Sequence, residues 1–329
     1  MGEPAHPARR FSAFARRRWD TPTLLSFVVL AALLLLNILI DPNFFTGFSL
    51  TTFFTDAVPL VLVAAGQFAV ILTGGIDLSV GSVLSIANVF VATHMASSTG
   101  SMAAVAAGVL LFGALAGWVN GLAVHYGRIQ PILVTLATMS IYEGIALVLL
   151  PNPGGTVPAA LTNDLTGTVF GVPVAVLILA ALAGLWAWAQ RTRFVLHLVA
   201  LGSDEAAARM NGVRIGVVKM GAYVLSGFFA AASGLYLAAE TTSGDPNVGA
   251  PLTLLSIAAV VIGGTRLSGG RGNLFGVMAG ALVLSILGSI MFFAHVSSYY
   301  QNLFQGLILL VAVGLSSWRR LSGRYMKTR

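Results

Sequence analysis

The sequence predicts an all-α protein that crosses a membrane about ten times. Hydrophobic residues make up 57% of the 329 residues and charged residues only 9%, whereas a soluble domain is about 25% charged. Apolar runs close to membrane-spanning length recur along the chain. The lysines and arginines lie in or beside the connections between these runs and in the two tails. Within lipid, such runs form helices because the backbone must satisfy its own hydrogen bonds.

Ten apolar runs are expected as spans, separated by polar or glycine-rich connections. The first follows three arginines, and no signal-peptide cleavage site comes after it, so we interpret it as an uncleaved span. The eighth is noticeably short. The expected organisation is a basic tail over residues 1–20, one transmembrane domain over 21–318 and a second basic tail over 319–329. The spans are 23–40, 58–73, 80–95, 102–124, 131–150, 172–190, 217–239, 252–262, 273–293 and 299–317.

The basic residues predict the orientation of the chain. If the N-terminus is cytoplasmic, all 18 lysines and arginines fall on the cytoplasmic side, and a missed or extra span would break this segregation. Both termini are therefore expected in the cytoplasm. Besides those in the two tails, the residues that support this topology are Arg128, Arg191, Arg193, Arg209, Arg214, Lys219, Arg266 and Arg271.

A short skeleton, G-G-x-x-L-S-x-G, occurs twice, each time between two apolar runs. Both copies follow a span that runs from outside to inside, so the repeat is expected to be parallel rather than inverted. The first copy contributes Gly74, Gly75, Asp77, Ser79 and Gly81. The second copy contributes Gly263, Gly264, Arg266, Ser268 and Gly270.

Asp77 allows two interpretations. The two glycines would end one helix and Ser79 would cap the next, which leaves Asp77 beside a positive helix N-terminus. Alternatively, Asp77 lies at an ion or substrate site in a broken helix deep in the membrane. The second copy has Arg266 at the same position, and a coupling-ion site would not be expected to tolerate that exchange. The sequence therefore favours a cytoplasmic turn in which Asp77 makes a helix-end or interdomain contact.

Five polar residues within or near the spans could line a polar path. Glu143 is an acid well inside a predicted span, which makes it a candidate for function, or it lies near a helix end and is satisfied by neighbours. The others are candidates for the same path, but each could equally form a helix–helix hydrogen bond. They are Gln67, Asn88, Asn120 and Thr138.

Residues 191–216 form the longest polar connection on the cytoplasmic side and could be gripped by a partner protein or remain solvated. A short helix is expected over 203–210, with Ser203 as its N-cap and acidic residues in its first turn. Asn211-Gly212 should end it. The candidate contact residues are Asp204, Glu205, Ala206, Ala207, Arg209, Asn211 and Gly212.

Several function classes are excluded by the composition. The chain has no cysteine, so disulfides and thiol chemistry are absent. It has no G-x-x-x-x-G-K-[S/T] motif, and its five histidines show no spacing typical of a metal site. No nucleophile–base pair is suggested, so no enzyme activity, metal or cofactor is expected in this chain. The positive charge follows the topology rule, so nucleic acid is not an expected partner.

Three motifs carry a resemblance to a known family. They are L-T-G-G-I-D-L-S-V-G-S-V at 72–83, P-I-L-V-T-L-A-T-M at 131–139, and A-A-V-V-I-G-G-T leading into G-G-R-G at 258–272. Together they resemble the permease subunits of bacterial ABC sugar importers of the ribose, xylose, arabinose and galactofuranose type. The likeness extends from about residue 20 to 318, with the motifs in order and at the family's spacing.

The resemblance implies a permease of the bacterial inner membrane that imports a monosaccharide. It also implies a second permease subunit, identical or paralogous, and a periplasmic sugar-binding protein. Two cytoplasmic ABC ATPases would carry ATP and magnesium, which explains the missing ATPase motif. Residues 203–215 match the position of the family's coupling helix, and E-A-A at 205–207 is similar to the E-A-A-x-x-x-G loop of ABC importers. Asn211 stands at the glycine position of that loop, and Gly212 follows it.

The chain departs from its relatives at two further places. T-L-L-S at 253–256 replaces an acidic E-L-D-A of many members, and Glu143 stands where many have arginine. Both differences could bear on the choice of substrate or partner. Two other functions also stay open. One is a self-sufficient transporter that uses Asp77 or Glu143 as a proton site. Another is an ABC permease for a different small polar solute, such as autoinducer-2 or a branched-chain amino acid.

Overall fold

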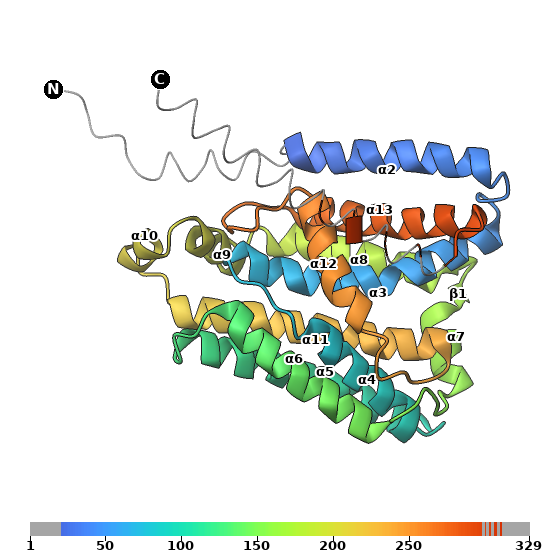
Figure 1. The fold of residues 1–329 in the computed structure, drawn as a ribbon, viewed down its shortest axis with the longest axis horizontal. Coiled ribbons are helices and arrows are strands. Elements are labelled where there is room, and N and C mark those ends of the chain that lie inside the picture. The colour runs from blue at the N-terminus through green and yellow to red at the C-terminus, as the bar shows by residue number, and fades with distance from the viewer. Residues whose placement is uncertain (1–20, 298–299, 301–302, 304–305, 308–309, 311–329) are drawn as a thin grey trace.

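The computed structural model describes residues 21–297 together with residues 300, 303, 306, 307 and 310, and it shows a helical bundle (Figure 1). Six helices in this part of the chain are long and apolar enough to cross a membrane. The all-α prediction is thus confirmed for the described residues, apart from one short hairpin. The six helices are α2 (Thr21–Ile40), α3 (Gly47–Leu72), α5 (Thr99–His125), α6 (Pro131–Leu149), α11 (Ile215–Thr241) and α13 (Leu274–Phe293).

The remaining elements are shorter. α8 (Val174–Ala189) and α9 (Arg193–Ser203) form a pair bent by 77°, which would make a seventh span if counted together. A two-residue turn joins the antiparallel strands β1 and β2. The other short elements are α4 (Val80–His94), α7 (Ala159–Thr166), β1 (Thr168–Val169), β2 (Val172–Pro173), α10 (Glu205–Met210) and α12 (Ala250–Ile262).

Nine of the ten expected spans coincide with helices of the described residues, but not all of these helices are long enough to span. α4 has 15 residues and α12 has 13. At 1.5 Å per residue they are about 23 and 20 Å long, short of a hydrocarbon core of about 30 Å. For the nine expected spans that the described residues cover, the structure therefore gives six or seven candidates. Most of the tenth expected span (299–317) and both tails lie outside the described residues.

α3 begins eleven residues before the expected span, and it takes in Phe48, Phe53 and Phe54. Thr46 caps the helix by accepting the N–H of Ser49 at 3.3 Å. Phe53 then packs edge to face against Phe44, with ring centroids 5.5 Å apart. Both rings are buried. The cap and the aromatic pair stabilise a helical turn that the apolar periodicity alone did not predict.

α4 and α12 are half-length helices whose N-termini lie side by side inside the bundle. The segment before α12 descends along α4: Asp245 N–H donates to Asn88 at 2.8 Å, and Gly249 N–H donates to Ser85 at 3.0 Å. Gly249 then lies against the backbone of Gly81, the second residue of α4, so closely that a Cβ on either glycine would overlap the other. A chain segment thus enters the bundle from each side, and the two segments meet at this contact.

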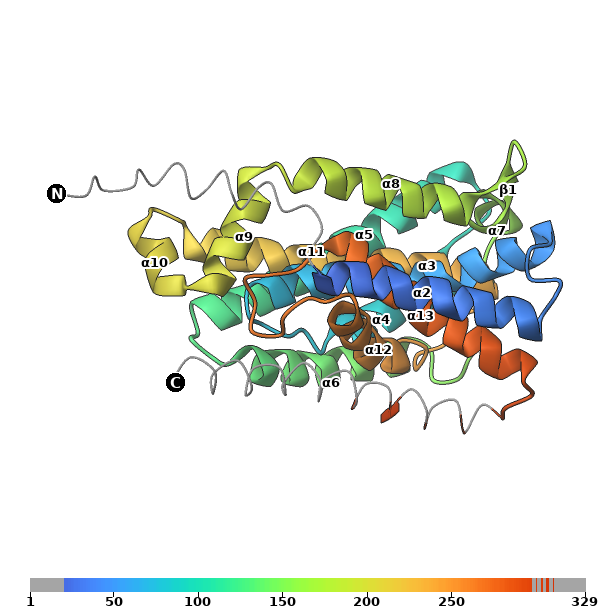
Figure 2. The ribbon, with the colours of Figure 1, turned by 90° about the horizontal axis from the view of Figure 1, so that it is seen from above.

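α11 lies at the centre of the fold and packs against α5, α3 and α4. Its closest approach is to α5, where Gly113 and Gly227 face each other with no room for a Cβ on either. Small residues at such crossings allow two helices in lipid to pack backbone to backbone. On the other side α13 packs against α2, α12 and α3, and α8 covers another flank (Figure 2).

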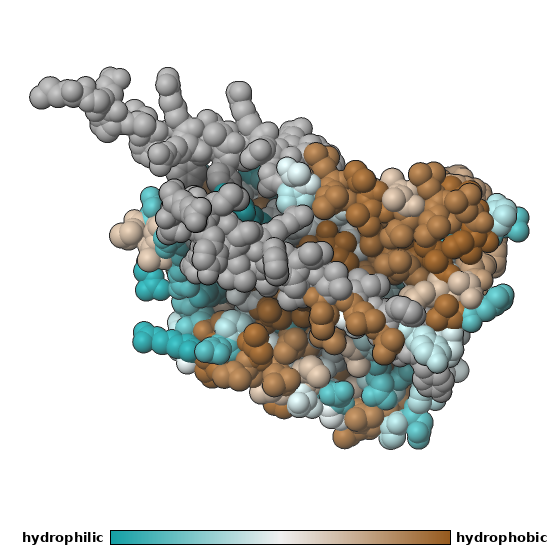
Figure 3. All heavy atoms as spheres, turned by 45° about the horizontal axis from the view of Figure 1, so that its top comes forward, coloured by the Kyte–Doolittle hydropathy of each residue, from teal (hydrophilic) through white to brown (hydrophobic). Residues whose placement is uncertain are grey.

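The surface agrees with a membrane environment. Hydrophobic side chains cover the flanks of the long helices, and hydrophilic ones gather at the two ends of the molecule (Figure 3). Leu39 on α2 is 81% exposed and Val148 on α6 is 84% exposed. Apolar surface of this extent suits lipid rather than water.

Candidate functional site

The first glycine-rich turn carries its acid into the interior of the bundle. Asp77 is only 1% exposed. Its Oδ1 accepts hydrogen bonds from the backbone N–H and the hydroxyl of Ser79, at 3.0 and 2.7 Å. Its Oδ2 accepts the hydroxyl of Ser226 on α11 at 2.8 Å. Three donors from two segments therefore hold this carboxylate where it has almost no solvent exposure.

The prediction that the Ser79 side chain caps α4 is wrong. α4 does begin directly after Ser79, but the Ser79 hydroxyl makes no capping hydrogen bond. It donates to Asp77 and accepts from the side-chain amide of Asn120 on α5, 2.8 Å away. A capping serine has to accept from the N–H groups of its helix. Here Asn120 uses that acceptor instead, and Ser79 links α5 to the Asp77 carboxylate.

Asp77 also lies deeper than the predicted cytoplasmic contact. Its partner Ser226 is eleven residues beyond Ile215, the first residue of α11. That separation is about 16 Å along the helix axis. The chain between α3 and α4 does not turn at the surface but runs back into the bundle before α4 begins. Asp77 is therefore an interior residue. This position agrees better with the alternative interpretation, in which Asp77 lies at a break deep in the membrane.

The second turn keeps its charge at the surface. Arg266 is exposed, and its backbone N–H donates to the carbonyl of Arg271 at 3.0 Å, which closes a loop. Gly269 and Gly270 both have left-handed backbone angles, with φ of 80° and 74°. The Gly270 N–H donates to the carbonyl of Leu72, the last residue of α3, at 3.0 Å. The second turn is thereby joined to the end of the helix that precedes the first turn.

The end of α9 completes this contact. A Cβ at Gly202 would overlap both the carbonyl oxygen of Leu72 and the backbone nitrogen of Gly270. A Cβ at Gly269 would lie 2.7 Å from the backbone nitrogen of Gly74. We call these five residues the glycine junction. It brings the two repeat turns and the segment that precedes α10 into backbone contact.

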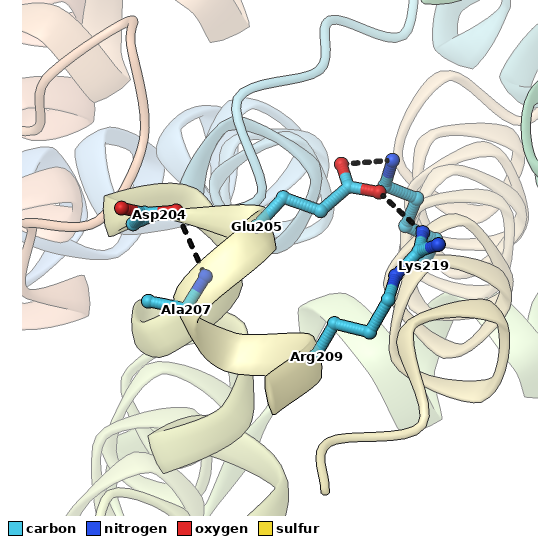
Figure 4. Close-up of polar contacts among 5 residues, drawn as sticks. All are labelled: Asp204, Glu205, Ala207, Arg209 and Lys219. Carbon is cyan, nitrogen blue, oxygen red and sulfur yellow. Dashed lines mark hydrogen bonds and ion pairs between the residues drawn. The ribbon is translucent and has the colours of Figure 1, made fainter. Parts of the chain in front are cut away.

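α10 follows the junction directly and is held by polar contacts at both ends (Figure 4). Its N-cap is Asp204, whose carboxylate accepts the N–H of Ala207 at 3.0 Å. The prediction of Ser203 as the cap is wrong, because Ser203 is the last residue of α9. The predicted end is confirmed: Asn211 is the C-cap and Gly212 has a φ of 79°.

Glu205 connects α10 to the start of α11. Its carboxylate pairs with Lys219 at 2.8 Å and with Arg209 at 3.4 Å (Figure 4). The hydrogen bond from Lys219 lowers the pKa of Glu205, with smaller contributions from the charges of Lys219 and Arg209. The Glu205 side chain is 44% exposed, so solvent screens these pairs. Beside them, Ala206 is exposed and Met210 presents 83% of its surface.

A cavity of about 1000 Å³ opens between the ends of α5 and α6, the segment 205–209 and the start of α11. Gly74 and Gly75 of the first repeat turn form part of its wall. Glu205 and Arg209 of the candidate contact segment form another part. Its remaining charged groups are all basic: Arg128, Arg214, Lys219 and, in its protonated form, His125.

The candidate path residues do not converge on one site. Asn120 is hydrogen-bonded to Ser79, and we call the linked residues Asp77, Ser79, Asn120 and Ser226 the Asp77 cluster. Asn88 lies elsewhere and accepts the backbone N–H of Asp245 before α12. Gln67 is fully buried on α3, and its side-chain nitrogen and oxygen have no hydrogen-bond partner among the described residues. Thr138 donates to the carbonyl of Val134 in its own helix at 3.2 Å. Glu143 is half-buried on α6.

Three site residues, Gly202, Tyr223 and Ser226, are not predictable from the sequence. Tyr223 and Ser226 lie in an apolar span with no motif around them, and Gly202 lies outside the expected short helix. Ser226 contacts Asp77, 149 positions away, and Gly202 contacts Gly270, 68 positions away. A serine inside an apolar run is only a weak indication of a functional residue, and the tertiary contact with Asp77 is needed to identify it.

Comparison with known proteins supports the resemblance expected from the motifs. The family described as "Branched-chain amino acid transport system / permease component" matches residues 49–313. The ribose import permease protein of Haemophilus influenzae is 35% identical over 294 residues, which cover 88% of this chain and 91% of that protein. No solved structure matches the chain.

Two further relatives have names that refer to other sugars. The D-allose transport system permease protein of Escherichia coli is 31% identical over 88% of this chain and 90% of that protein. The galactose/methyl galactoside import permease protein of Escherichia coli is 30% identical over 88% of this chain and 93% of that protein.

Proposed function

This chain belongs to the family of branched-chain amino acid transport system permease components, and we propose that it is the membrane subunit of an ABC importer that takes up a monosaccharide. The matches to permeases for ribose, allose and galactose each span 88% of the chain. The protein is thus a non-catalytic, multi-pass subunit of a bacterial inner membrane.

The observation that carries the proposal is the glycine junction. α10 is a short exposed helix with an apolar residue, Met210, presented to solvent. It follows α9, whose Gly202 lies in backbone contact with the ends of both repeat turns. A displacement of α10 by a partner would be transmitted through tightly packed backbone rather than through flexible side chains. We therefore assign α10 as the element that an ATPase moves.

The orientation follows from the charges. The basic residues around the cavity and α10 favour a cytoplasmic location for that end, with both termini on the same side. The cytoplasmic partner is then an ABC ATPase, which supplies ATP and magnesium. At the opposite end a periplasmic sugar-binding protein delivers the substrate. A second permease subunit, identical or paralogous, completes the membrane core.

In the proposed cycle, ATP binding brings two ATPases together and moves the α10 helices. α9 transfers the movement to Leu72 and to the second turn through the junction. Because the first turn is anchored to α5 and α11 by the Asp77 cluster, the helix ends around the cavity shift relative to that anchor. The permease then alternates between outward and inward states, and the sugar passes along a weakly binding polar path.

A test uses Met210→Glu in the complete transporter, reconstituted with its ATPase and binding protein. A charge on this exposed apolar side chain should weaken ATPase assembly at least tenfold and reduce sugar uptake in parallel. The matched control is Phe170→Glu, because Phe170 is fully exposed on the hairpin at the opposite end of the molecule (Figure 1). Unchanged assembly and uptake in Met210→Glu, or equal losses in both variants, would count against the assignment of α10.

A second candidate function is favoured by one observation, the buried carboxylate of Asp77 with hydroxyl donors around it. Such a group could exchange a proton in a self-sufficient secondary transporter. Proteoliposomes that contain this chain alone distinguish the two functions. Sugar uptake driven by a pH gradient without an ATPase would establish proton coupling, whereas the ABC function predicts no uptake until the ATPase, ATP and binding protein are added.

A further inference from the structure

The deepest residue of the cavity wall on α11 is a tyrosine. The cavity is bounded on this helix by residues 215–217 and by Lys219 and Tyr223, of which Tyr223 is the furthest from the helix start. Tyr223 is only 1% exposed, yet its hydroxyl has no hydrogen-bond partner among the described residues. A buried hydroxyl without a hydrogen-bond partner destabilises the fold. Its position at the inner limit of a cavity therefore calls for an explanation.

Tyr223 is wedged between α5 and the first repeat turn. A Cβ at Gly75 would lie 2.8 Å from the phenol oxygen. On the other side, a Cβ at Gly121 would lie 3.4 Å from the tyrosine Cβ, and a Cβ at Gly117 would overlap the tyrosine carbonyl oxygen. Gly75 thus leaves room for the phenol, while Gly117 and Gly121 let α5 pack closely against the backbone and Cβ of Tyr223.

The Asp77 cluster lies immediately beyond this ring. Ser226 follows Tyr223 by three residues on α11, so the two side chains lie on the same face of the helix. Ser226 donates to Asp77 at 2.8 Å, so the Asp77 carboxylate is reached one helical turn beyond Tyr223. The carbonyl oxygen of the Asn120 side chain is also buried without a partner among the described residues. The phenol thus separates the cavity from a cluster of buried polar groups.

The chemistry of the cluster suits hydroxyl groups. A carboxylate and an amide oxygen accept hydrogen bonds, and serine and tyrosine hydroxyls both donate and accept. The unpartnered oxygens of Asn120 and Tyr223 would be satisfied by a ligand that carries several hydroxyls. The cluster holds one buried carboxylate, which disfavours an anionic solute by repulsion. A neutral polyol is the class that these groups fit.

We propose that Tyr223 is the inner gate of the translocation path, and that Asp77, Ser226 and Asn120 behind it bind the hydroxyl groups of a sugar in transit. This inference rests on the proposed sugar-import function. It assigns the cavity as the cytoplasmic mouth of the path. When the first repeat turn shifts, Gly75 moves away from the phenol and the ring swings into the cavity. The hydroxyl groups of the sugar then leave the Asp77 cluster and form hydrogen bonds with water.

The absence of native cysteines makes a direct test feasible, because one introduced thiol is the only thiol in the chain. Ser226→Cys places that thiol behind the gate with little change in size. Inside-out membrane vesicles without ATPase are treated with a membrane-impermeant, positively charged methanethiosulfonate, and the labelling rate is measured. We expect at least a tenfold faster rate when Tyr223→Ala is added, and no increase with Tyr223→Phe, which keeps the ring. Equal rates with and without the ring would overturn the gate.

Two further thiols serve as controls. Val217→Cys in the cavity wall should react quickly in every background, because Val217 is 57% exposed. Ala231→Cys, fully buried against α5, should stay unreactive. If Ala231→Cys reacts in the Tyr223→Ala background, the bundle has loosened, and Tyr223→Val, a smaller truncation, replaces it. A labelling rate of the Ser226→Cys thiol that stays unchanged with Tyr223→Val then overturns the gate.

The ligand class is tested in the opened variant, Ser226→Cys with Tyr223→Ala. D-ribose, D-allose or D-galactose at millimolar concentration should slow labelling at least threefold, whereas leucine should not. Protection by leucine alone, or by no sugar, overturns the hydroxyl-binding assignment. Since these measurements need neither ATPase nor uptake, they are separate from the proposed function. That function fails if the complete transporter with native Tyr223 takes up no sugar.

Discussion

The two copies of G-G-x-x-L-S-x-G end their helices in the same way but use the rest of the skeleton differently. In the first copy, Gly74 N–H donates to Ile71 at 2.9 Å and Gly75 N–H donates to Val70 at 3.2 Å. In the second, the N–H groups of Gly264 and Thr265 make the same pair of bonds, at 2.9 and 3.1 Å. This pattern is the Schellman ending, which needs one residue in the left-handed conformation.

The left-handed residue is the first glycine of one copy and the second glycine of the other. Gly74 has a φ of 83° and Gly264 a φ of 86°, whereas Gly263 is still in the helical region at −63°. The two copies are therefore offset by one residue in three dimensions. A pair of glycines accommodates either register, so the sequence alone does not show which glycine ends the helix.

After the turn the copies diverge. Six residues (74–79) lead from the first ending into α4, and they take Asp77 into the interior. Ten residues (264–273) lead from the second ending into α13, and they leave Arg266 at the surface. The comparison teaches that the glycines define a helix end, while the partners available to the charged residue decide whether the connection enters the bundle.

The largest expected effect tests this difference in charge. Asp77→Ala leaves the hydroxyls of Ser79 and Ser226 without their acceptor, at a cost of about 1–3 kcal/mol for each unsatisfied group. We expect at least a tenfold loss of ATP-driven sugar uptake and a lower unfolding temperature. Arg266→Ala at the matching position should stay within about 0.5 kcal/mol. Equal losses in the two variants would contradict the distinction between the copies.

The next effect tests the point where the copies meet. Gly202→Ala forces a methyl group into the Leu72 carbonyl and the second turn, and overpacking of this kind costs about 1–3 kcal/mol. We expect ATP hydrolysis to continue with little uptake, because the movement of α10 is no longer transmitted. Gly288→Ala, a helical glycine with nothing within 4 Å of its Cβ, is the control. Full uptake in Gly202→Ala would rule out a transmitting role for the junction.

A smaller effect sharpens the offset between the copies. Gly74→Ala and Gly264→Ala each place a side chain in the left-handed region, which costs about 1–2 kcal/mol. Gly264→Ala should be the more destabilising, because its Cβ would also lie 2.6 Å from Pro22. Thermal unfolding in nanodiscs measures both. Gly263→Ala is the control for steric crowding. Its Cβ would lie against the backbone of Gly276 and Val277, but Gly263 is not in the left-handed region, so any loss of stability comes from crowding alone.

The smallest effect concerns pH. The pKa of Glu205 is lowered in the folded protein, so its pairs with Lys219 and Arg209 stabilise the fold above the ordinary value of 4.5. This contribution is lost as the pH falls below that value and through the lowered pKa. Because the side chain is exposed, it should stay below about 1 kcal/mol and shrink in high salt. Glu205→Gln should remove this part of the pH dependence, as thermal unfolding between pH values of about 3 and 7 would show.

Much of the fold follows from apolar periodicity, because lipid forces each apolar run to form a helix. Nine of the ten expected segments are helical in the described residues. The depth of a helix is not encoded locally, so the periodicity predicts full spans where α4 and α12 are half-length. The same reason explains Asp77: a tight surface turn and a segment that re-enters the bundle share the same glycines, and only contacts with Ser226 and Asn120 distinguish them.

The candidate site also has features that the sequence predicts and features that only the tertiary contacts define. The short helix after α9 and its end at Asn211 were predictable from helix formers and an Asn-Gly pair. Its cap was not, because Ser203 and Asp204 are both good caps and the end of α9 decides between them. Thr138 and Glu143 stay predictions as path residues. Tyr223 could not be proposed from a span whose facing neighbours were unknown.

The contact between Gly81 and Gly249 has a consequence for how the permeability barrier is built. At that level two helix N-termini abut, and neither α4 nor α12 continues through it. The barrier there depends on van der Waals contact between two backbones and on the hydrogen bond from Gly249 N–H to Ser85, which together cost less to separate than a continuous ladder of helical hydrogen bonds. A passage can therefore open or close by a small sliding of two helix ends, with every helical hydrogen bond left intact.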